Sequence, residues 1–278
     1  MSSPLVIDGV SPYVLRVPEG HTIHRLASDL ARDLGGQRLE VSSPQGRFGD
    51  AESLSGTRLL RTDAVGKHLF LHFDPAVVHI HLGLFGRFRR FTLPAPEPRG
   101  ALRLRLVGES HAWDLRGPTC CEIIEEDARA TLLARLGADP LSSAADPKPA
   151  WERIRKSTRA LGAVLLDQSI FAGLGNVYRA EILFMLGLHP EMPARSLTKR
   201  EFDKLWKLAR ELLARGVKER RIVTKPKIAG RRLRRDEALH VYARSECEVC
   251  YSPVRRWTLG ARRVYACETC QPLRRAAV

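Results

Sequence analysis

The amino-acid sequence predicts an α+β protein: an N-terminal helix plus a β-sandwich domain, then a helical domain, and last a small cysteine-bearing module. Three observations lead to this fold class. Apolar residues recur at helical spacing after Pro18, alternate in short β-rich runs from Arg38 to about Glu125, and return to helical spacing near Glu126. The length of 278 residues suits one large or two medium domains, and 44% hydrophobic residues are enough for a substantial core.

The first domain, residues 18–137, begins with one amphipathic helix that the pair Gly35-Gly36 would end. Its helix-spaced apolar residues are Ile23, Leu26, Leu30 and Leu34. Gly, Pro and Asp then separate several alternating runs, which we expect to be strands. These runs cover residues 68–73, 77–81, 87–93 and 102–107. Such a domain closes as a β-sandwich or barrel.

A proline-rich connector leads to a second, helical domain over residues 150–240. Thr198 and Glu201 form a capping box that starts a helix, and Gly216 stands where that helix would end. Residues 215–235 hold ten Lys or Arg and one acid, together with Pro226 and Gly230. A mobile basic loop is therefore expected there.

The C-terminal module, residues 241–278, contains four of the six cysteines as two Cys-x-x-Cys pairs with sixteen residues between them. This is the spacing of a four-cysteine zinc ribbon. We expect one structural Zn²⁺ held by Cys247, Cys250, Cys267 and Cys270. The intervening residues read as a hairpin with four arginines, Arg255, Arg256, Arg262 and Arg263. For the cysteines, the alternative is two redox Cys-x-x-Cys motifs, but the βαβ pattern that usually surrounds such motifs is missing. For the arginines, the alternative is a solvated basic face without a binding role.

Charge and hydropathy indicate nucleic acid as the partner. Lys and Arg number 46 against 31 Asp and Glu, a formal net charge of +15. No run approaches the roughly 20 apolar residues of a membrane span, and residues 1–17 lack the features of a secretory signal. The expectation is a cytoplasmic protein, associated with the nucleoid through DNA.

Four motifs occur in one order along the chain: Pro18-Glu19-Gly20, Val65-Gly66-Lys67-His68, the segment GLGNVY at 173–178, and the cysteine ribbon. Together they resemble the family of formamidopyrimidine-DNA glycosylase and endonuclease VIII over residues 18 to about 272, and the opening PEGHTIHR is more similar to the endonuclease VIII branch. The resemblance implies a helix-two-turns-helix unit and a bifunctional DNA glycosylase and apurinic/apyrimidinic lyase of base excision repair. Such an enzyme removes oxidised bases, pyrimidines favoured, from double-stranded DNA, acts at abasic sites, and nicks the strand by β,δ-elimination. We expect a monomer.

The resemblance assigns catalysis to Pro18, Glu19 and Lys67. A proline at a true N-terminus is a secondary amine, and α-amino groups titrate near pH 8, so a fraction of such groups is nucleophilic at neutral pH. Glu19 would protonate the sugar ring oxygen and shuttle protons, and Lys67 would hold phosphates by charge. The plainer interpretations are an ordinary helix start for Pro18-Glu19 and a solvated strand residue for Lys67.

Four further residues are expected at the DNA. Asn176 would cap a helix that follows a helix over 161–168 and a glycine-rich double turn, and would bind phosphate. By the resemblance, Arg262 contacts phosphate from the hairpin tip, and Leu84 and Phe85 fill the space of an extruded base. Burial in the sandwich core is the alternative for the apolar pair.

His79 and His81 share one strand face and are conceivable metal ligands. No carboxylate or third ligand lies near them in the sequence, so a structural or phosphate-contacting role is favoured.

Two features depart from the family's pattern. Thr22 replaces the second glutamate of the opening motif, and Pro18 is not the first residue as numbered. A start at Val17 through a GUG codon, followed by removal of the initiator, would free the Pro18 amine. The sequence leaves two other functions open: a formamidopyrimidine-type glycosylase preferring oxidised purines, and a non-catalytic zinc-dependent DNA-binding protein whose extension blocks Pro18.

Overall fold

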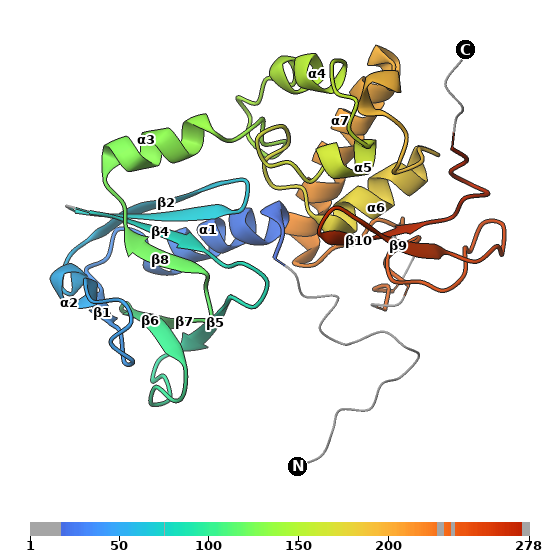
Figure 1. Cartoon of the computed structure of the whole chain (residues 1–278). Helices are drawn as coiled ribbons and strands as arrows, with labels where there is room; N and C mark the ends of the chain where they lie inside the picture. The colour runs from blue at the N-terminus through green and yellow to red at the C-terminus, as the bar shows by residue number, and fades with distance from the viewer. Residues whose placement is uncertain (1–17, 75, 227–230, 235–236, 274–278) are drawn as a thin grey trace. The chain divides into compact units, whose positions relative to one another are not determined.

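The computed structural model describes residues 18–273 apart from 75, 227–230 and 235–236 (Figure 1). Residues 1–17, the expected extension, lie outside the described residues. The chain divides into two compact units, one spanning Pro18–Arg135 and the other beginning at Leu136. Each unit has its own apolar clusters and is described by itself.

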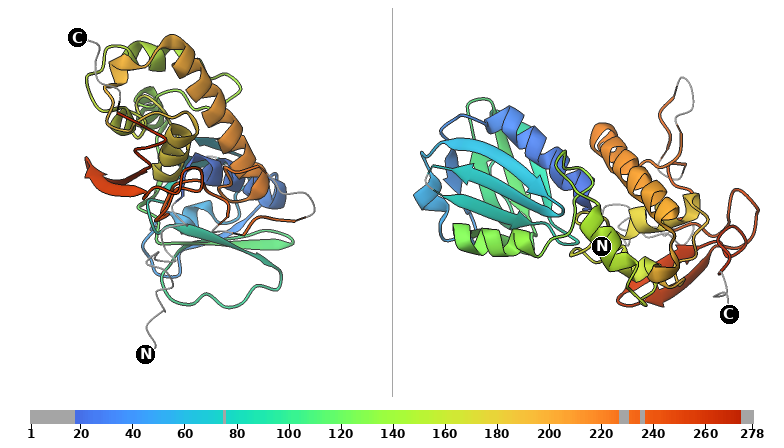
Figure 2. Two further views of the ribbon diagram at one scale, coloured as in Figure 1. Left: turned by 90° about the vertical axis from the view of Figure 1, so that its right-hand side faces the viewer. Right: turned by 90° about the horizontal axis from the view of Figure 1, so that it is seen from above.

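The N-terminal unit is a sandwich of two four-stranded antiparallel sheets, ordered β1-β6-β7-β5 and β2-β3-β4-β8 (Figures 1 and 2). The strands are β1 (Glu40–Ser42), β2 (Leu59–Val65), β3 (His68–Phe73), β4 (Val77–His81), β5 (Arg87–Thr92), β6 (Leu102–Val107), β7 (His111–Arg116) and β8 (Cys120–Ile123). The helices are α1 (Gly20–Leu34), α2 (Ala51–Leu54) and α3 (Glu126–Ala134). The expected sandwich and its N-terminal helix are confirmed.

One apolar cluster fills the space between the two sheets and α1. Ile23 and Leu30 from α1 meet Leu69 of β3 and Leu106 of β6 in this cluster, and each is at most 1% exposed. Burying one such side chain stabilises the fold by about 1.5–3 kcal/mol. Helix α1 therefore closes one side of the sandwich, and the start of that helix is held rigidly by the core.

The second unit is helical, with α4 (Lys148–Ile154), α5 (Leu161–Val164), α6 (Asn176–Met185), the 3-10 helix η2 (Ala194–Ser196) and α7 (Lys199–Glu219). The capping box is present: the Thr198 hydroxyl accepts from the Glu201 amide, and the Glu201 carboxylate accepts from the Thr198 amide. The helix expected over 161–168 is shorter, because α5 stops at Val164. The Asp167 carboxylate accepts from the amide and hydroxyl of Ser169 and turns the chain instead.

Helix α7 runs past the expected stop at Gly216. Gly216 is buried inside the helix, and the helix ends at Glu219, where Arg220 takes the left-handed conformation with φ 60°. The basic loop expected over 215–235 is therefore wrong for residues 215–219. Part of the remainder, residues 227–230 and 235, lies outside the described residues.

The chain ends in the antiparallel hairpin of β9 (Arg255–Leu259) and β10 (Arg262–Ala266), joined through Gly260 with φ 63°. Residues of this module share an apolar cluster with α6: Val254 and Tyr265 pack with Val177 and Phe184. The ribbon is therefore part of the second unit's core. Among the described residues, no helix combines the length and apolar character needed to cross a membrane.

Candidate functional site

Pro18 and Glu19 stand just before α1, and both are buried. Glu19 is the residue that precedes the helix, with φ −121° and 0% exposure, and its carboxylate does not cap the helix. An ordinary helix start has proline in the first helical position and an acid in the first turn, whereas the first turn of α1 contains no acid. The local geometry thus differs from the plain helix-start interpretation and buries a carboxylate beside Pro18.

Thr22 stands where the resemblance expects a glutamate. Its amide donates to the Glu19 carbonyl at 2.8 Å, and its hydroxyl lies 3.2 Å from Nε2 of His21. Burial and, to a smaller extent, the positive charge of Arg25 lower the pKa of His21 to about 3. A hydroxyl and a neutral imidazole therefore replace a carboxylate at this point.

Lys67 lies in the two-residue connection between β2 and β3. Gly66 precedes it with φ 60°, the positive value that a type II′ hairpin turn needs at its first position. The adjoining pair Val65 and His68 is in register across the two strands. Lys67 is thus presented by a tight hairpin in the same unit as Pro18 and Glu19.

Leu84 and Phe85 form the turn between β4 and β5, where they are 41% and 77% exposed. The alternative that they pack in the sandwich core is therefore wrong. Gly86 must be glycine, because a Cβ there would meet the Leu82 carbonyl oxygen at 2.2 Å. The turn holds two large apolar side chains in solvent.

Asn176 is the first residue of α6 and does not cap it; Gly175 occupies the capping position. The expected cap is wrong because the Asn176 side chain is used elsewhere: its amide nitrogen donates to the Arg263 carbonyl at 3.0 Å. The guanidinium of Arg179, 1% exposed, donates to the same carbonyl at 2.8 Å and to the side-chain oxygen of Asn176. These bonds attach the hairpin to the beginning of α6.

The four hairpin arginines differ in their surroundings. Arg255 donates to Glu268 at 2.9 Å and Arg256 to the Arg244 carbonyl at 3.2 Å, so these two are engaged within the protein. Arg262 opens β10, pairs with Leu259 at the hairpin end, and is exposed. The arrangement presents Arg262 at the tip, as the resemblance implies.

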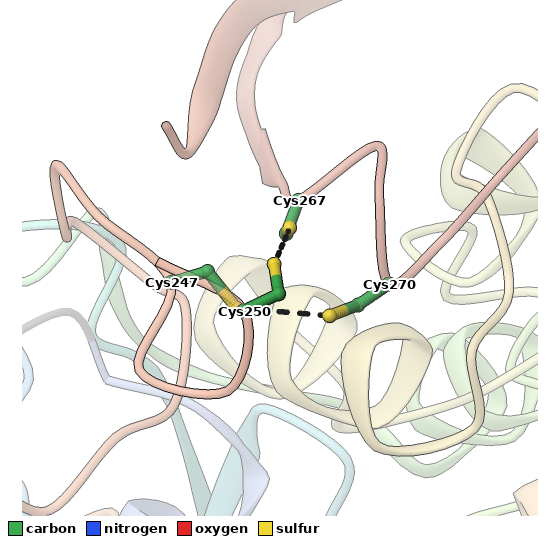
Figure 3. A group of neighbouring side chains, drawn as sticks. All are labelled: Cys247, Cys250, Cys267 and Cys270. Atoms are coloured by element: carbon green, nitrogen blue, oxygen red, sulfur yellow. Dashed lines mark hydrogen bonds between the residues drawn. The ribbon is translucent and has the colours of Figure 1, made fainter. Parts of the chain in front are cut away.

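The four ribbon cysteines converge (Figure 3). All four sulfurs lie within 4.8 Å of one another, with Cys247 3.8 Å from Cys270 and Cys250 3.4 Å from Cys267, and none forms a disulfide. A tetrahedral zinc with Zn–S bonds of about 2.3 Å holds its sulfurs about 3.8 Å apart. Hydrogen bonds from Ser252 lower the pKa of Cys250 to about 6. The four sulfurs can hold a metal ion.

Two features were not anticipated from the sequence. Glu181, 0% exposed, accepts from the amides of His240, Val241 and Tyr242 at 2.7–2.9 Å and so holds the chain that leads into the ribbon. The sequence feature that could have indicated this role is an acidic residue among the apolar residues of α6. The second feature is a cluster of His79, Cys120 and Glu122 on one sheet face. It was not predicted because His79 is far from the other two residues in the sequence.

Comparison with known proteins covers nearly the whole chain. Residues 17–121 match a family model described as the formamidopyrimidine-DNA glycosylase N-terminal domain, and residues 136–227 match one described as the formamidopyrimidine-DNA glycosylase H2TH domain. Endonuclease 8 1 of Mycobacterium tuberculosis is 43% identical over 273 residues, covering 92% of this chain and 100% of the relative. The formamidopyrimidine-DNA glycosylase of Thermus thermophilus is 33% identical over 269 residues, covering 92% and 97%.

Among solved structures, Lactococcus lactis Fpg in complex with DNA containing N7-benzyl-Fapy-dG matches with a TM-score of 0.77. The match covers 92% of this chain and 100% of that chain at 23% identity, and it shows that the fold is shared.

Proposed function

The chain belongs to the formamidopyrimidine-DNA glycosylase family of base excision repair glycosylases and lyases, and we propose that its substrates are oxidised pyrimidines in double-stranded DNA. In this proposal it removes the damaged base and nicks the strand by β,δ-elimination. The observation that carries the preference for pyrimidines is the 43% identity to Endonuclease 8 1 over nearly the full length of both chains. In this proposal the protein acts as a monomer on nucleoid DNA in the cytoplasm.

Pro18 is the proposed nucleophile and Glu19 the proposed general acid. The Pro18 amine attacks the anomeric carbon, the bond to the damaged base breaks, and the base leaves with a proton. The resulting iminium acidifies the neighbouring sugar carbon, so that successive eliminations release the strand ends. The burial of the Glu19 carboxylate supports this role, because in a low-dielectric site the interaction of a proton donor with the sugar oxygen is stronger than it is in water. Lys67 holds the phosphate beside the reacting nucleotide.

This chemistry requires a free amine at Pro18. An amide nitrogen has no available lone pair, so a chain that retains residues 1–17 is inactive as a lyase in this proposal. The start of the matched N-terminal domain at residue 17 supports a mature chain that begins with Pro18.

We propose that Arg262 contacts phosphate through its guanidinium and Asn176 through the backbone amides at the start of α6. Leu84 and Phe85 are proposed to fill the stack after base extrusion. The exposure of the apolar pair supports its role, since a wedge must reach the duplex. We further propose one structural Zn²⁺ on the four ribbon cysteines, where it would fix the hairpin that carries Arg262.

Borohydride trapping tests the nucleophile. A chain that begins at Pro18 should form a covalent adduct with DNA carrying an oxidised pyrimidine, and the full chain, shown by intact mass to retain Met1, should not. Zinc content must be matched, because ribbon loss would imitate nucleophile loss. Equal trapping by both chains would assign the chemistry to another amine, with Lys67 examined first.

Incision of matched duplexes tests the substrate. One duplex carries an oxidised pyrimidine and the other an oxidised purine, with the same flanking sequence. Faster incision of the purine lesion would identify a formamidopyrimidine-type enzyme. DNA binding without incision of either duplex by the chain starting at Pro18 would identify a non-catalytic binding protein.

A further inference from the structure

A second group of metal-ligating side chains lies on the β2-β3-β4-β8 sheet, apart from the ribbon. Strands β4 and β8 pair antiparallel, with His79 opposite Glu122 and His81 opposite Cys120. Alternate residues of a strand share a face, so His79, Cys120 and Glu122 lie on the same side of the sheet. Cys121 points to the opposite side and belongs to the apolar core.

The ligand atoms of these three residues are close enough for one ion. Nδ1 of His79 lies 3.3 Å from Oε1 of Glu122 and 3.5 Å from Sγ of Cys120, and all three ligand atoms lie within 4.8 Å of one another. A tetrahedral zinc with bonds of about 2.0–2.3 Å to N, O and S separates neighbouring ligand atoms by about 3.3–3.7 Å. Two of the distances already match this requirement.

The imidazole of His79 is held in place by its surroundings. Its other nitrogen, Nε2, lies 2.9 Å from Nδ1 of His68, and its ring stacks against the rings of His68 and Phe70 with centroids 5.1 and 5.2 Å away. When Nε2–H donates to His68, Nδ1 has its lone pair directed toward Cys120 and Glu122. A hydrogen bond on the second nitrogen commonly orients a metal-binding histidine in this way.

We propose that His79, Cys120 and Glu122 bind a second divalent cation of borderline softness, with Zn²⁺ as the probe. Nitrogen and sulfur ligands disfavour Mg²⁺ and Ca²⁺, which take oxygen ligands. On binding, the Cys120 thiol releases its proton to solvent, and the thiolate and carboxylate together balance the charge of the ion. The Glu122 side chain is 58% exposed, which leaves room for a water as fourth ligand.

Metal titration of the intact protein tests this proposal. Protein with its ribbon saturated and free metal removed should take up one further equivalent of Zn²⁺ and gain thermal stability in doing so. Cys120→Ala and His79→Ala should each weaken this second equivalent at least tenfold and retain the first. Cys121→Ala is the matched control, a neighbouring cysteine on the core side of the strand, and should keep both equivalents.

Cobalt provides a readout that is specific for sulfur. Co²⁺ added to protein whose ribbon is already saturated with Zn²⁺ should produce thiolate-to-metal charge-transfer absorption in the wild type and in Cys121→Ala, and none in Cys120→Ala. A stoichiometry that stays at one ion per chain would overturn the proposal, as would equal loss of the second ion in Cys120→Ala and Cys121→Ala. These measurements do not involve DNA, so their failure leaves the proposed glycosylase function untouched.

Discussion

Asp33 joins α1 to the β1-β6-β7-β5 sheet of the sandwich through a buried carboxylate. Its oxygens accept from Nε of Arg90 at 2.5 Å, from Arg32 at 3.0 Å and from the indole of Trp113 at 3.1 Å. Burial alone would raise the pKa of Asp33, but the bonds from Arg90 and Arg32 outweigh it and lower the pKa. The charged carboxylate is therefore favoured by the folded state.

Asp33→Asn should destabilise the N-terminal unit by about 1–3 kcal/mol at pH 7, because buried donors lose a charged acceptor. A depressed folded-state pKa contributes stability above the unfolded pKa of about 3.9, and this contribution disappears as the pH falls through the lower folded value. Urea unfolding at pH 7 and pH 3 measures both effects. The difference between wild type and variant should be smaller at pH 3, and an equal difference at both values would show that charge is not involved.

Leu84 and Phe85 allow function to be separated from stability. Because both are exposed, replacing the pair by Ala should change the free energy of unfolding by no more than about 1 kcal/mol. Excision from a duplex should fall much more than cleavage at an abasic site in single-stranded DNA, since only the duplex requires extrusion. Incision rates on the two substrates, together with the melting temperature of the variant, distinguish a role in base extrusion from a role in stability. Equal losses on both substrates would remove the pair from extrusion.

Sequence distance limits what could be foreseen about individual residues. The ribbon cysteines were recognisable because each pair is local and the two pairs have a characteristic spacing. Cys120 and Glu122 lie 41 and 43 residues from His79, so only strand pairing brings them together. The sequence indicated His79 as a conceivable metal ligand, but it did not reveal the other two members of the cluster.

The C-terminal hairpin exposes Arg262 at its tip, whereas Arg255 of the same hairpin donates a hydrogen bond to Glu268. Arg262→Ala should weaken binding to all DNA sequences and reduce the slope of log affinity against log salt by about 0.9, the value for one phosphate contact. Arg255→Ala is the matched control and should change the slope less. Fluorescence anisotropy at several salt concentrations measures the slopes. A wild-type slope in Arg262→Ala would take that residue out of the interface.

Strands were predictable as elements because alternation and glycine or proline boundaries are local properties. The ends of α5 and α7 were not. Gly216 resembles a stop signal, yet it is buried within α7, and packing carries the helix on to Glu219. After α5, the Asp167 side chain makes turns where apolar spacing alone indicated more helix. Tertiary packing determines the end of α7, and the two hydrogen bonds of the Asp167 side chain determine the end of α5.

In the molecule as a whole, the two units would depend differently on a metal ion bound by the four ribbon cysteines, as proposed above. The cluster of the sandwich lies entirely within its own unit, whereas Val177 and Phe184 of α6 pack with Cys247 and Tyr265 of the ribbon. The simplest expectation from the sequence is a ribbon that collapses alone. The shared cluster predicts instead that α6 would lose packing contacts when the ribbon collapses.

Cys247→Ser should therefore increase hydrogen exchange in the ribbon and in α6, leave the sandwich protected, and weaken DNA binding by removing the ordered hairpin. Thr269→Ala, which retains all four sulfurs, serves as the control. Hydrogen exchange followed by mass spectrometry resolves the segments. Unchanged protection of α6 in the cysteine variant would show that its packing is independent of the ribbon.

The packing of α6 against the ribbon also sets an order for biosynthesis. The sandwich has all its core residues once Cys121 has been made, and it is free to fold early. The face of α6 that carries Val177 and Phe184 is completed only after Tyr265 and Cys267 have been made, which at about 5–20 residues per second is several seconds after Met185. During that interval this face lacks its ribbon partners. If zinc orders the ribbon as proposed, zinc starvation should reduce the yield of newly made protein more than the activity of molecules already folded.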